Sequence, residues 1–160
     1  MPTPLHLWLK DDRGADMRGS SAVVGREGSI EVLSFAHSVH APADRVTGQL
    51  MGGRAHRPLI IEKEIDRSSV LLNLAVVRGQ TLASAEFRWY RTNDAGKEEE
   101  YYNITLGNVK VASISPKVPN IKEVATAHRN HFEIVEFRYE EIAWSFLDGN
   151  LRFKDALTLV

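Results

Sequence analysis

Histidine is the residue in this sequence whose spacing most suggests chemistry. The six His include two pairs with the spacing His-x-x-His, which are His37/His40 and His128/His131. Zinc takes three or four converging ligands, and a three-residue spacing puts two His on one face only in a helix. His37 falls in an expected strand and His128 in an expected loop, there is no Cys, and no Glu completes an HExxH motif. The sequence therefore predicts surface or hydrogen-bonded His, with no metal and no other cofactor.

Other catalytic patterns are also missing from the sequence. Three consecutive Glu at residues 98–100 follow Lys97 beside an expected turn, where solvated charges are the simplest interpretation. Acid/base catalysis needs two carboxylates in a dry cleft with separated pKa values. No Gly-x-Ser-x-Gly motif occurs, and Gly52-Gly53-Arg54 lacks the Lys-Ser/Thr of a phosphate-binding loop. We therefore expect no enzymatic activity.

The composition favours an ordinary globular protein. The 160 residues are 43% hydrophobic and 26% charged, and they predict one domain over residues 1–160. A net charge of −1 gives no electrostatic basis for binding nucleic acid or an anionic membrane. The N-terminus lacks the basic-then-apolar layout of a signal peptide, and no apolar run is long enough to span a bilayer. The chain is expected to fold in the cytoplasm and to need other machinery if it is exported.

The elements expected to position these residues are mostly strands. Residues 87–111 read as a long β-hairpin, in which apolar Phe87 and Trp89 alternate with polar neighbours before the turn chemistry of residues 92–96. The apolar phase slips by one within residues 29–39 and again at Gly107, which predicts β-bulges. Further strands are expected at residues 5–10, 29–39, 59–65 and 132–144, long connections at 13–28, 41–57 and 115–131, and a short tail at 151–160.

One segment, residues 67–78, reads as a helix. Asp66 or Ser68 can accept a hydrogen bond from its first-turn amides, and Gly79 suits a left-handed C-terminal position. An apolar stripe is expected to pack on the sheet; it consists of Val70, Leu71, Leu74 and Ala75. Six or seven strands with recurrent bends predict an antiparallel sheet that closes on itself, as a barrel or a sandwich with one helix beside it.

Four blocks of sequence resemble the haemolysin-coregulated protein (Hcp) family, the tube subunit of bacterial type VI secretion systems. The first resembles a family strand with the pattern Glu-Val-x-x-Phe-x-His, and the second ends in a Gly-x-Arg-x-His-x-Pro segment. The blocks are residues 30–39 (IEVLSFAHSV), 48–58 (GQLMGGRAHRP), 89–106 (WYRT, GKE and YNITL in order) and 135–144 (VEFRYEEIAW).

The resemblance implies a mainly β protein, a compact antiparallel β-barrel with one α-helix packed at its side. It implies homohexameric rings that stack into a hollow tube, with a spike protein, contractile sheath and baseplate as partners and secreted effectors carried in the lumen. The subunit would be cytoplasmic before firing and secreted without a cleavable signal peptide. It would carry no C-terminal toxin extension. The alternative is a carrier or chaperone ring for effectors that does not form long tubes.

The connection at residues 41–57 is expected to make contacts between subunits or stacked rings. Long loops in compact domains are usually functional, and this one places apolar residues in a polar stretch. An alternative role for His56 is a structural hydrogen bond within the subunit. The expected contact residues are Val46, Gly48, Leu50, Met51, Arg54 and His56.

Overall fold

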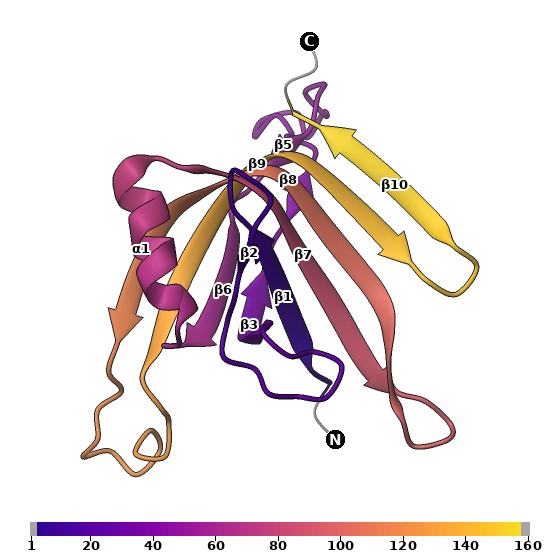
Figure 1. The fold of residues 1–160 in the computed structure, drawn as a ribbon. Helices are drawn as coiled ribbons and strands as arrows, with labels where there is room; N and C mark the ends of the chain where they lie inside the picture. Colours follow the sequence, from indigo (N-terminus) through magenta and orange to yellow (C-terminus); the bar gives the residue numbers. More distant parts are fainter. Residues whose placement is uncertain (1–2, 158–160) are drawn as a thin grey trace.

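The computed structural model describes residues 3–157. Within this range the chain forms one helix and ten strands, several of them long enough to run past the barrel that they build (Figure 1). The strands are β1 (Leu5–Lys10), β2 (Asp16–Met17), β3 (Ile30–Ala36), β4 (Val39–His40), β5 (Ala55–His56), β6 (Leu59–Glu64), β7 (Thr81–Thr92), β8 (Glu98–Lys117), β9 (Phe132–Phe146) and β10 (Leu151–Ala156), and the helix is α1 (Ser68–Arg78).

Six antiparallel strands close into a barrel in the order β9-β6-β3-β1-β7-β8, and β8 pairs again with β9. Alternating side chains from every wall strand fill the interior, and Leu7, Ile61, Phe87 and Phe137 are fully buried there. Closure leaves no open edge within the barrel wall. The predicted antiparallel barrel with one helix at its side is therefore confirmed. No helix in residues 3–157 has the length and apolar character needed to cross a membrane.

Bulges bend the wall, but not all of them lie where the sequence pattern places them. The predicted bulge in residues 29–39 is confirmed, because the pairing of β3 with β6 shifts between Val32 and Ser34. The predicted bulge at Gly107 is wrong. Gly107 stays in register with both neighbouring strands, and the shift in the pairing of β8 with β9 comes later, between Val111 and Ser113. Buried positions change phase on β7 and β8 together near Gly107, so the sheet bends there without an extra residue.

Strands β7, β8 and β9 run past the barrel, and together with β10 they continue its sheet beyond the closed wall (Figure 1). There the far half of β9 pairs with β8 on one side and with β10 on the other, so that β10, β9, β8 and β7 lie side by side. The tail expected from residue 151 onward is therefore a strand up to Ala156, and residues 158–160 lie outside the described range.

The helix packs against the barrel with a face that contains only Ala75 of the predicted stripe, so the prediction is wrong for Val70, Leu71 and Leu74. Leu72 and Ala75 are 0% and 1% exposed, whereas Val70 is 74% exposed and Leu71 and Leu74 are each 37% exposed. Apolar residues occur on both sides of the helix, so their spacing alone does not select the buried side.

Both predicted ends of the helix are found. Asp66 Oδ1 accepts the Ser68 amide at 2.8 Å, and Gly79 adopts a left-handed φ of 59°.

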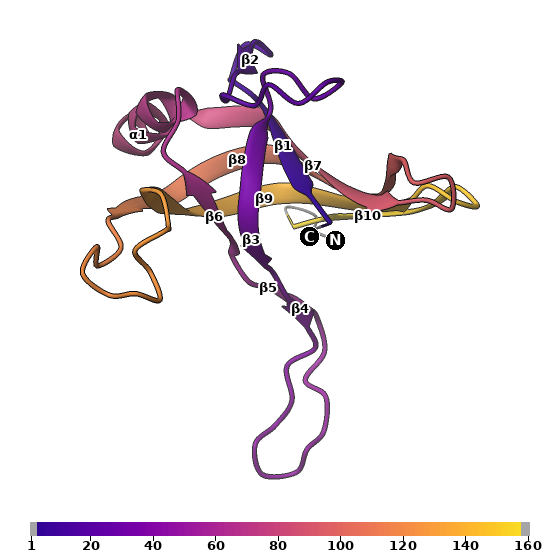
Figure 2. The same ribbon diagram turned by 90° about the horizontal axis from the view of Figure 1, so that it is seen from below.

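A long projection, which we call the arm, leaves the barrel between β3 and β6 (Figure 2). It comprises residues 39–56, with the short β4–β5 ladder at its base and a loop beyond it. The predicted long connection therefore stands out from the body of the protein instead of packing on it.

Candidate functional site

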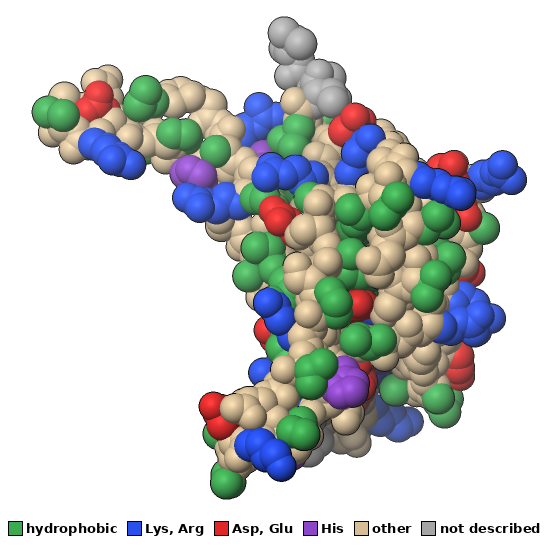
Figure 3. Space-filling view, turned by 90° about the vertical axis from the view of Figure 1, so that its left-hand side faces the viewer, with side chains coloured by type: hydrophobic (Ala, Val, Ile, Leu, Met, Phe, Trp, Pro, Cys, Tyr) green, Lys and Arg blue, Asp and Glu red, His purple; other side chains and the backbone are tan. Residues whose placement is uncertain are grey.

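The tip of the arm presents apolar side chains to solvent. Val46, Leu50 and Met51 are 93%, 66% and 57% exposed. Asp44 Oδ1 accepts the backbone amides of residues 46 and 47 at 2.7 and 3.0 Å, and Gly48 turns the chain with a φ of 72°. The tip is thus an ordered turn that displays apolar groups. Figure 3 shows the arm projecting from the body, with the surface hollowed between it and a second protrusion.

The base of the arm is anchored to the edge strand β10. Arg54 donates two hydrogen bonds to the Asp155 carboxylate, both at 3.0 Å, and a third to the Ala156 carbonyl at 2.9 Å. His56 Nε2 lies 2.7 Å from the same carboxylate. The hydrogen bonds from Arg54 and then His56 lower the pKa of Asp155 to about 2. Arg54 and His56, both predicted as intersubunit residues, therefore bind within the subunit.

A tyrosine connects two histidines beside this anchor. Tyr139 Oη, on β9, lies 2.7 Å from His37 Nε2 and 2.8 Å from His56 Nδ1. Burial, and next the Asp155 charge, raise the pKa of Tyr139 to about 12. Burial, and next His56, lower the pKa of His37. The structural hydrogen bond considered for His56 is present.

The two His-x-x-His pairs are not brought together as ligands. His37 binds Tyr139, while His40 is exposed on β4, and His128 and His131 are exposed in the loop at residues 118–131. Within residues 3–157, no three His, Cys, Asp or Glu side chains are grouped so as to hold a metal ion.

Each of the three consecutive Glu accepts a side-chain hydrogen bond, Glu99 from Asn93 and Glu100 from Asn103, and Glu98 forms an ion pair. Glu98 Oε2 accepts a hydrogen bond from Arg26 at 2.7 Å, and the Arg26 guanidinium lies 3.7 Å from the centre of the Tyr90 ring. The pair ties the loop at residues 13–28 to the β7–β8 hairpin. The charges of Arg26 and Glu98 therefore serve to hold this loop.

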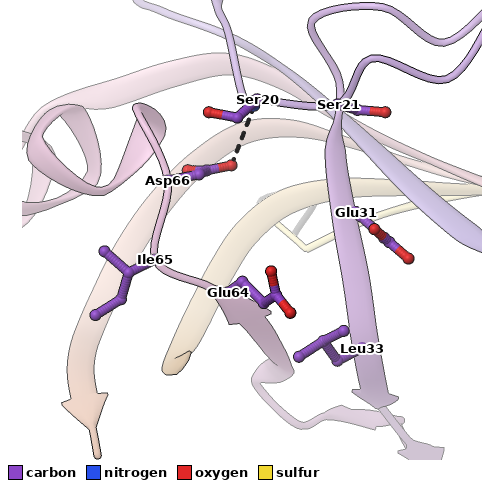
Figure 4. Close-up of a pocket in the computed structure, with 7 residues that line it drawn as sticks. All are labelled: Ser20, Ser21, Glu31, Leu33, Glu64, Ile65 and Asp66. Atoms are coloured by element: carbon purple, nitrogen blue, oxygen red, sulfur yellow. Dashed lines mark hydrogen bonds between the residues drawn. The ribbon is translucent and has the colours of Figure 1, made fainter. Parts of the chain in front are cut away.

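A shallow hollow lies between β3, the end of β6 and the segment leading into the helix (Figure 4). Its volume is about 170 Å³, and Glu31, Glu64 and Asp66 line it together with Leu33 and Ile65. Glu31 and Glu64 are exposed, and Asp66 is occupied by the Ser20 and Ser68 amides. The dry, desolvated carboxylate pair that acid/base catalysis requires is not formed in this hollow.

The sheet beyond the barrel ends in an open edge. Strand β10 pairs with β9 on one side and is the last strand of the sheet within the described residues. The Leu157 amide donates to the Glu140 carbonyl, so alternate residues of β10, including Phe153 and Asp155, turn their amides toward β9. Arg152 and Lys154 accordingly turn theirs outward, which leaves backbone groups able to pair with another strand.

The chain resembles known proteins over most of its length. Residues 7–146 match the family model described as "Type VI secretion system effector, Hcp". The "Major exported protein" of Pseudomonas aeruginosa is 36% identical over 130 residues, which cover 81% of this chain and 76% of that protein.

Solved structures agree with this match. A variant of Hcp1 from E. coli EAEC 042 is 50% identical, with a TM-score of 0.89, and the match covers 98% of this chain and 99% of that chain. Secreted protein Hcp3 from Pseudomonas aeruginosa is 25% identical, with a TM-score of 0.79, and the match covers 99% of this chain and 100% of that one. The closed barrel, the side helix and these matches together show that the chain belongs to the Hcp family of type VI secretion system proteins.

Proposed function

We propose that this protein is a structural subunit of the type VI secretion tube, which assembles into closed hexameric rings that stack and are exported. The observation that carries the proposal is the sheet beyond the barrel, whose two edges are open on opposite sides within residues 3–157. On one side lies β10, and on the other β7 runs past the start of β1, so that Arg91 and Thr92 lie beyond its ladder with β1.

Two different edges on one subunit favour a head-to-tail interface. Such an interface closes into a ring when the rotation between neighbours divides a full turn. Pairing β10 of one subunit with the hairpin side of the next would cover the outward amides of Arg152 and Lys154 and continue the sheet around the ring.

The arm supplies a second contact in this proposal. Its exposed residues Val46, Leu50 and Met51 dock on the neighbouring ring, and Gly48 keeps the turn that presents them. Arg54 and His56 act from inside the subunit by holding the base of the arm. The spike, sheath and baseplate of the secretion machine and its effectors are the partners that this role requires. A relative called a major exported protein supports export.

The ring is tested by blocking the outward amide of one β10 residue. Lys154→Pro removes that amide and leaves the pairing with β9 in place, since Pro is tolerated on an open edge. Lys154→Ala is the matched control, because it removes the same side chain and the exposed contact with Glu141 at 3.2 Å but keeps the amide.

Native mass spectrometry and negative-stain images report the result. We expect rings from the parent protein and from Lys154→Ala, and monomers with an unchanged circular-dichroism spectrum from Lys154→Pro. A parent protein that stays monomeric at micromolar concentration would contradict ring formation. Rings of Lys154→Pro would instead contradict the role of the β10 edge.

A further inference from the structure

Two imidazoles and one phenol form a continuous hydrogen-bonded chain at the base of the arm. His37 follows β3, Tyr139 belongs to the barrel wall in β9, and His56 belongs to β5. The two links measure 2.7 and 2.8 Å, and the Tyr139 residue and the His56 side chain are only 7% and 4% exposed. The chain therefore joins the arm to the barrel through Tyr139 and His56, which have little access to water, while His37 is half-buried.

Asp155 determines which atom donates and which accepts in each of these hydrogen bonds. An ionised carboxylate only accepts hydrogen bonds, so His56 Nε2 must carry a hydrogen toward it. Neutral His56 then has a lone pair on Nδ1, which accepts the Tyr139 hydroxyl. The oxygen of Tyr139 in turn accepts the hydrogen on His37 Nε2. With both imidazoles neutral, every donor faces an acceptor.

The chain can take up one added proton if its hydrogen bonds exchange donors and acceptors. A proton on His56 Nδ1 makes that atom a donor to the Tyr139 oxygen. Neutral His37 then moves its hydrogen to Nδ1 and accepts the Tyr139 hydroxyl at Nε2. All three links survive with opposite polarity.

A second proton cannot be accommodated. Both imidazoles would then donate to the Tyr139 oxygen, and the hydroxyl hydrogen would lose its acceptor in a buried position. Two positive rings would also flank the phenol, with ring centres 5.7 and 5.6 Å from it.

The surroundings offset this repulsion only at His56, whose Nε2 faces the Asp155 carboxylate, and Arg54 shares that carboxylate. Lys154 of β10 is paired with Glu141 of β9. His40 lies on the opposite side of the β4–β5 ladder, in register with Ala55. Two further cations line the hollow next to His56 and Tyr139; they are Arg57 and Arg138.

We propose that His37, Tyr139 and His56 form a proton-operated latch, which holds the base of the arm to the barrel with up to one bound proton and releases it with two. At neutral pH the base of the arm is then held both to the barrel wall by this latch and to β10 by Arg54, and in mildly acidic solution the Arg54 anchor alone remains. Burial and the neighbouring His56 lower the pKa of His37, so release lies on the acid side of the ordinary His range. A loss of ring stacking on release rests on the proposed function, whereas the release itself does not.

Hydrogen exchange in the β4–β5 ladder tests the latch, with rates at each pH divided by those of unstructured peptides. In the parent protein we expect about tenfold less protection at about pH 5 than at about pH 7.5. His37→Gln keeps a donor and an acceptor but cannot take the second proton, so its protection should persist in acid. Tyr139→Phe removes the shared hydroxyl and should lower protection at both pH values. His40→Gln, on the same ladder but outside the latch, should behave as the parent does.

The persistence of protection in His37→Gln is the decisive result, because general destabilisation cannot produce it. Equal protection at both pH values in the parent, or an acid loss in His37→Gln as large as in the parent, would overturn the latch. The measurement uses single rings or monomers and needs no tube. A protein that shows acid release but never stacks would therefore contradict the proposed function while leaving the latch standing.

Discussion

Lys63 and Glu133 form a buried ion pair between adjacent barrel strands, with Nζ 2.5 Å from Oε1 and with side chains 0% and 2% exposed. Lys63 also donates to the Glu64 carbonyl at 2.9 Å and contacts Asp66 at 3.0 Å, while Ser69 Oγ donates to Glu133 at 2.7 Å. The pair thereby joins β6 and β9 to the first turn of the helix. A charge this deeply buried is tolerated only when it is paired and hydrogen-bonded.

Removing one partner of this pair should be costly. Glu133→Ala leaves the ammonium of Lys63 with Asp66 as its remaining carboxylate, and we expect the free energy of unfolding to fall by about 3–5 kcal/mol. The double substitution Lys63→Met with Glu133→Leu should recover most of that loss, because it removes both charges. Asp16→Ala is the control, since its exposed pair with Lys10 should contribute no more than about 1 kcal/mol. Urea unfolding measures all three, and equal losses for Glu133→Ala and Asp16→Ala would contradict the prediction.

The helix offers a test of which face packs on the barrel. Leu72→Ala creates a cavity at a fully buried position and should lower the free energy of unfolding by about 2–5 kcal/mol. Leu71→Ala, one residue away and 37% exposed, should cost clearly less. Thermal unfolding followed by circular dichroism compares the two proteins. A larger loss at Leu71 would return the helix to the orientation expected from the sequence.

Acid should destabilise the protein partly through His6. Ser29 Oγ donates to the Arg26 carbonyl, so it accepts a hydrogen bond from His6 Nδ1 at 2.8 Å, which fixes a neutral tautomer. Burial first, and Arg26 second, lower the pKa of His6 from 6.5 to about 4, against an opposing effect of Glu98. The unfolded chain therefore binds this proton more tightly than the folded protein does. The stabilisation is complete above about pH 6.5 and is lost as the pH falls toward about 4.

The stabilisation lost at His6 in acid should lower the free energy of unfolding by an amount on the order of 2 kcal/mol. His6→Gln retains a donor for Ser29 but does not titrate, so its unfolding free energy should fall less than that of the parent between about pH 7 and pH 4. The exposed substitution His128→Gln should leave the pH dependence of the parent unchanged. Parallel pH profiles for the parent and His6→Gln would show that His6 does not contribute.

The strand pattern was predictable because alternation is a local signal. Phe87 and Phe137 alternate with polar neighbours over many residues and are both buried as expected. The edge strand β10 was missed although the turn at residues 148–150 precedes an alternating run, because Leu151 and Phe153 remain 67% and 66% exposed and pack on no barrel core. Its partner on β9 is fixed by pairing across a hairpin, which composition does not report.

The site at the base of the arm was only partly predictable. His56 stood out within its motif, and a hydrogen bond was considered for it. Its partners Tyr139 and Asp155 lie 83 and 99 residues away, and no local spacing connects them. The buried face of the helix was predicted correctly only at Ala75 for a similar reason, since the helical spacing joins Ala75 to Leu71 and Leu74 as well as to Leu72. Contacts between distant elements decided both cases.

The arm provides the final prediction, which concerns assembly. Deleting residues 46–53 removes the exposed tip but retains Arg54, His56 and the β4–β5 ladder, so the barrel should keep its thermal stability. A triple substitution of Val46, Leu50 and Met51 to Ser keeps the length of the arm and removes its apolar surface. Both proteins should still form rings and should fail to stack into tubes, because the contacts proposed for the next ring are gone. Electron microscopy of concentrated protein measures stacking. Secretion from a bacterial deletion strain that is complemented with each variant measures function. Normal tubes from the triple variant would show that the apolar tip does not mediate assembly, and tubes from the deletion would exclude the arm altogether.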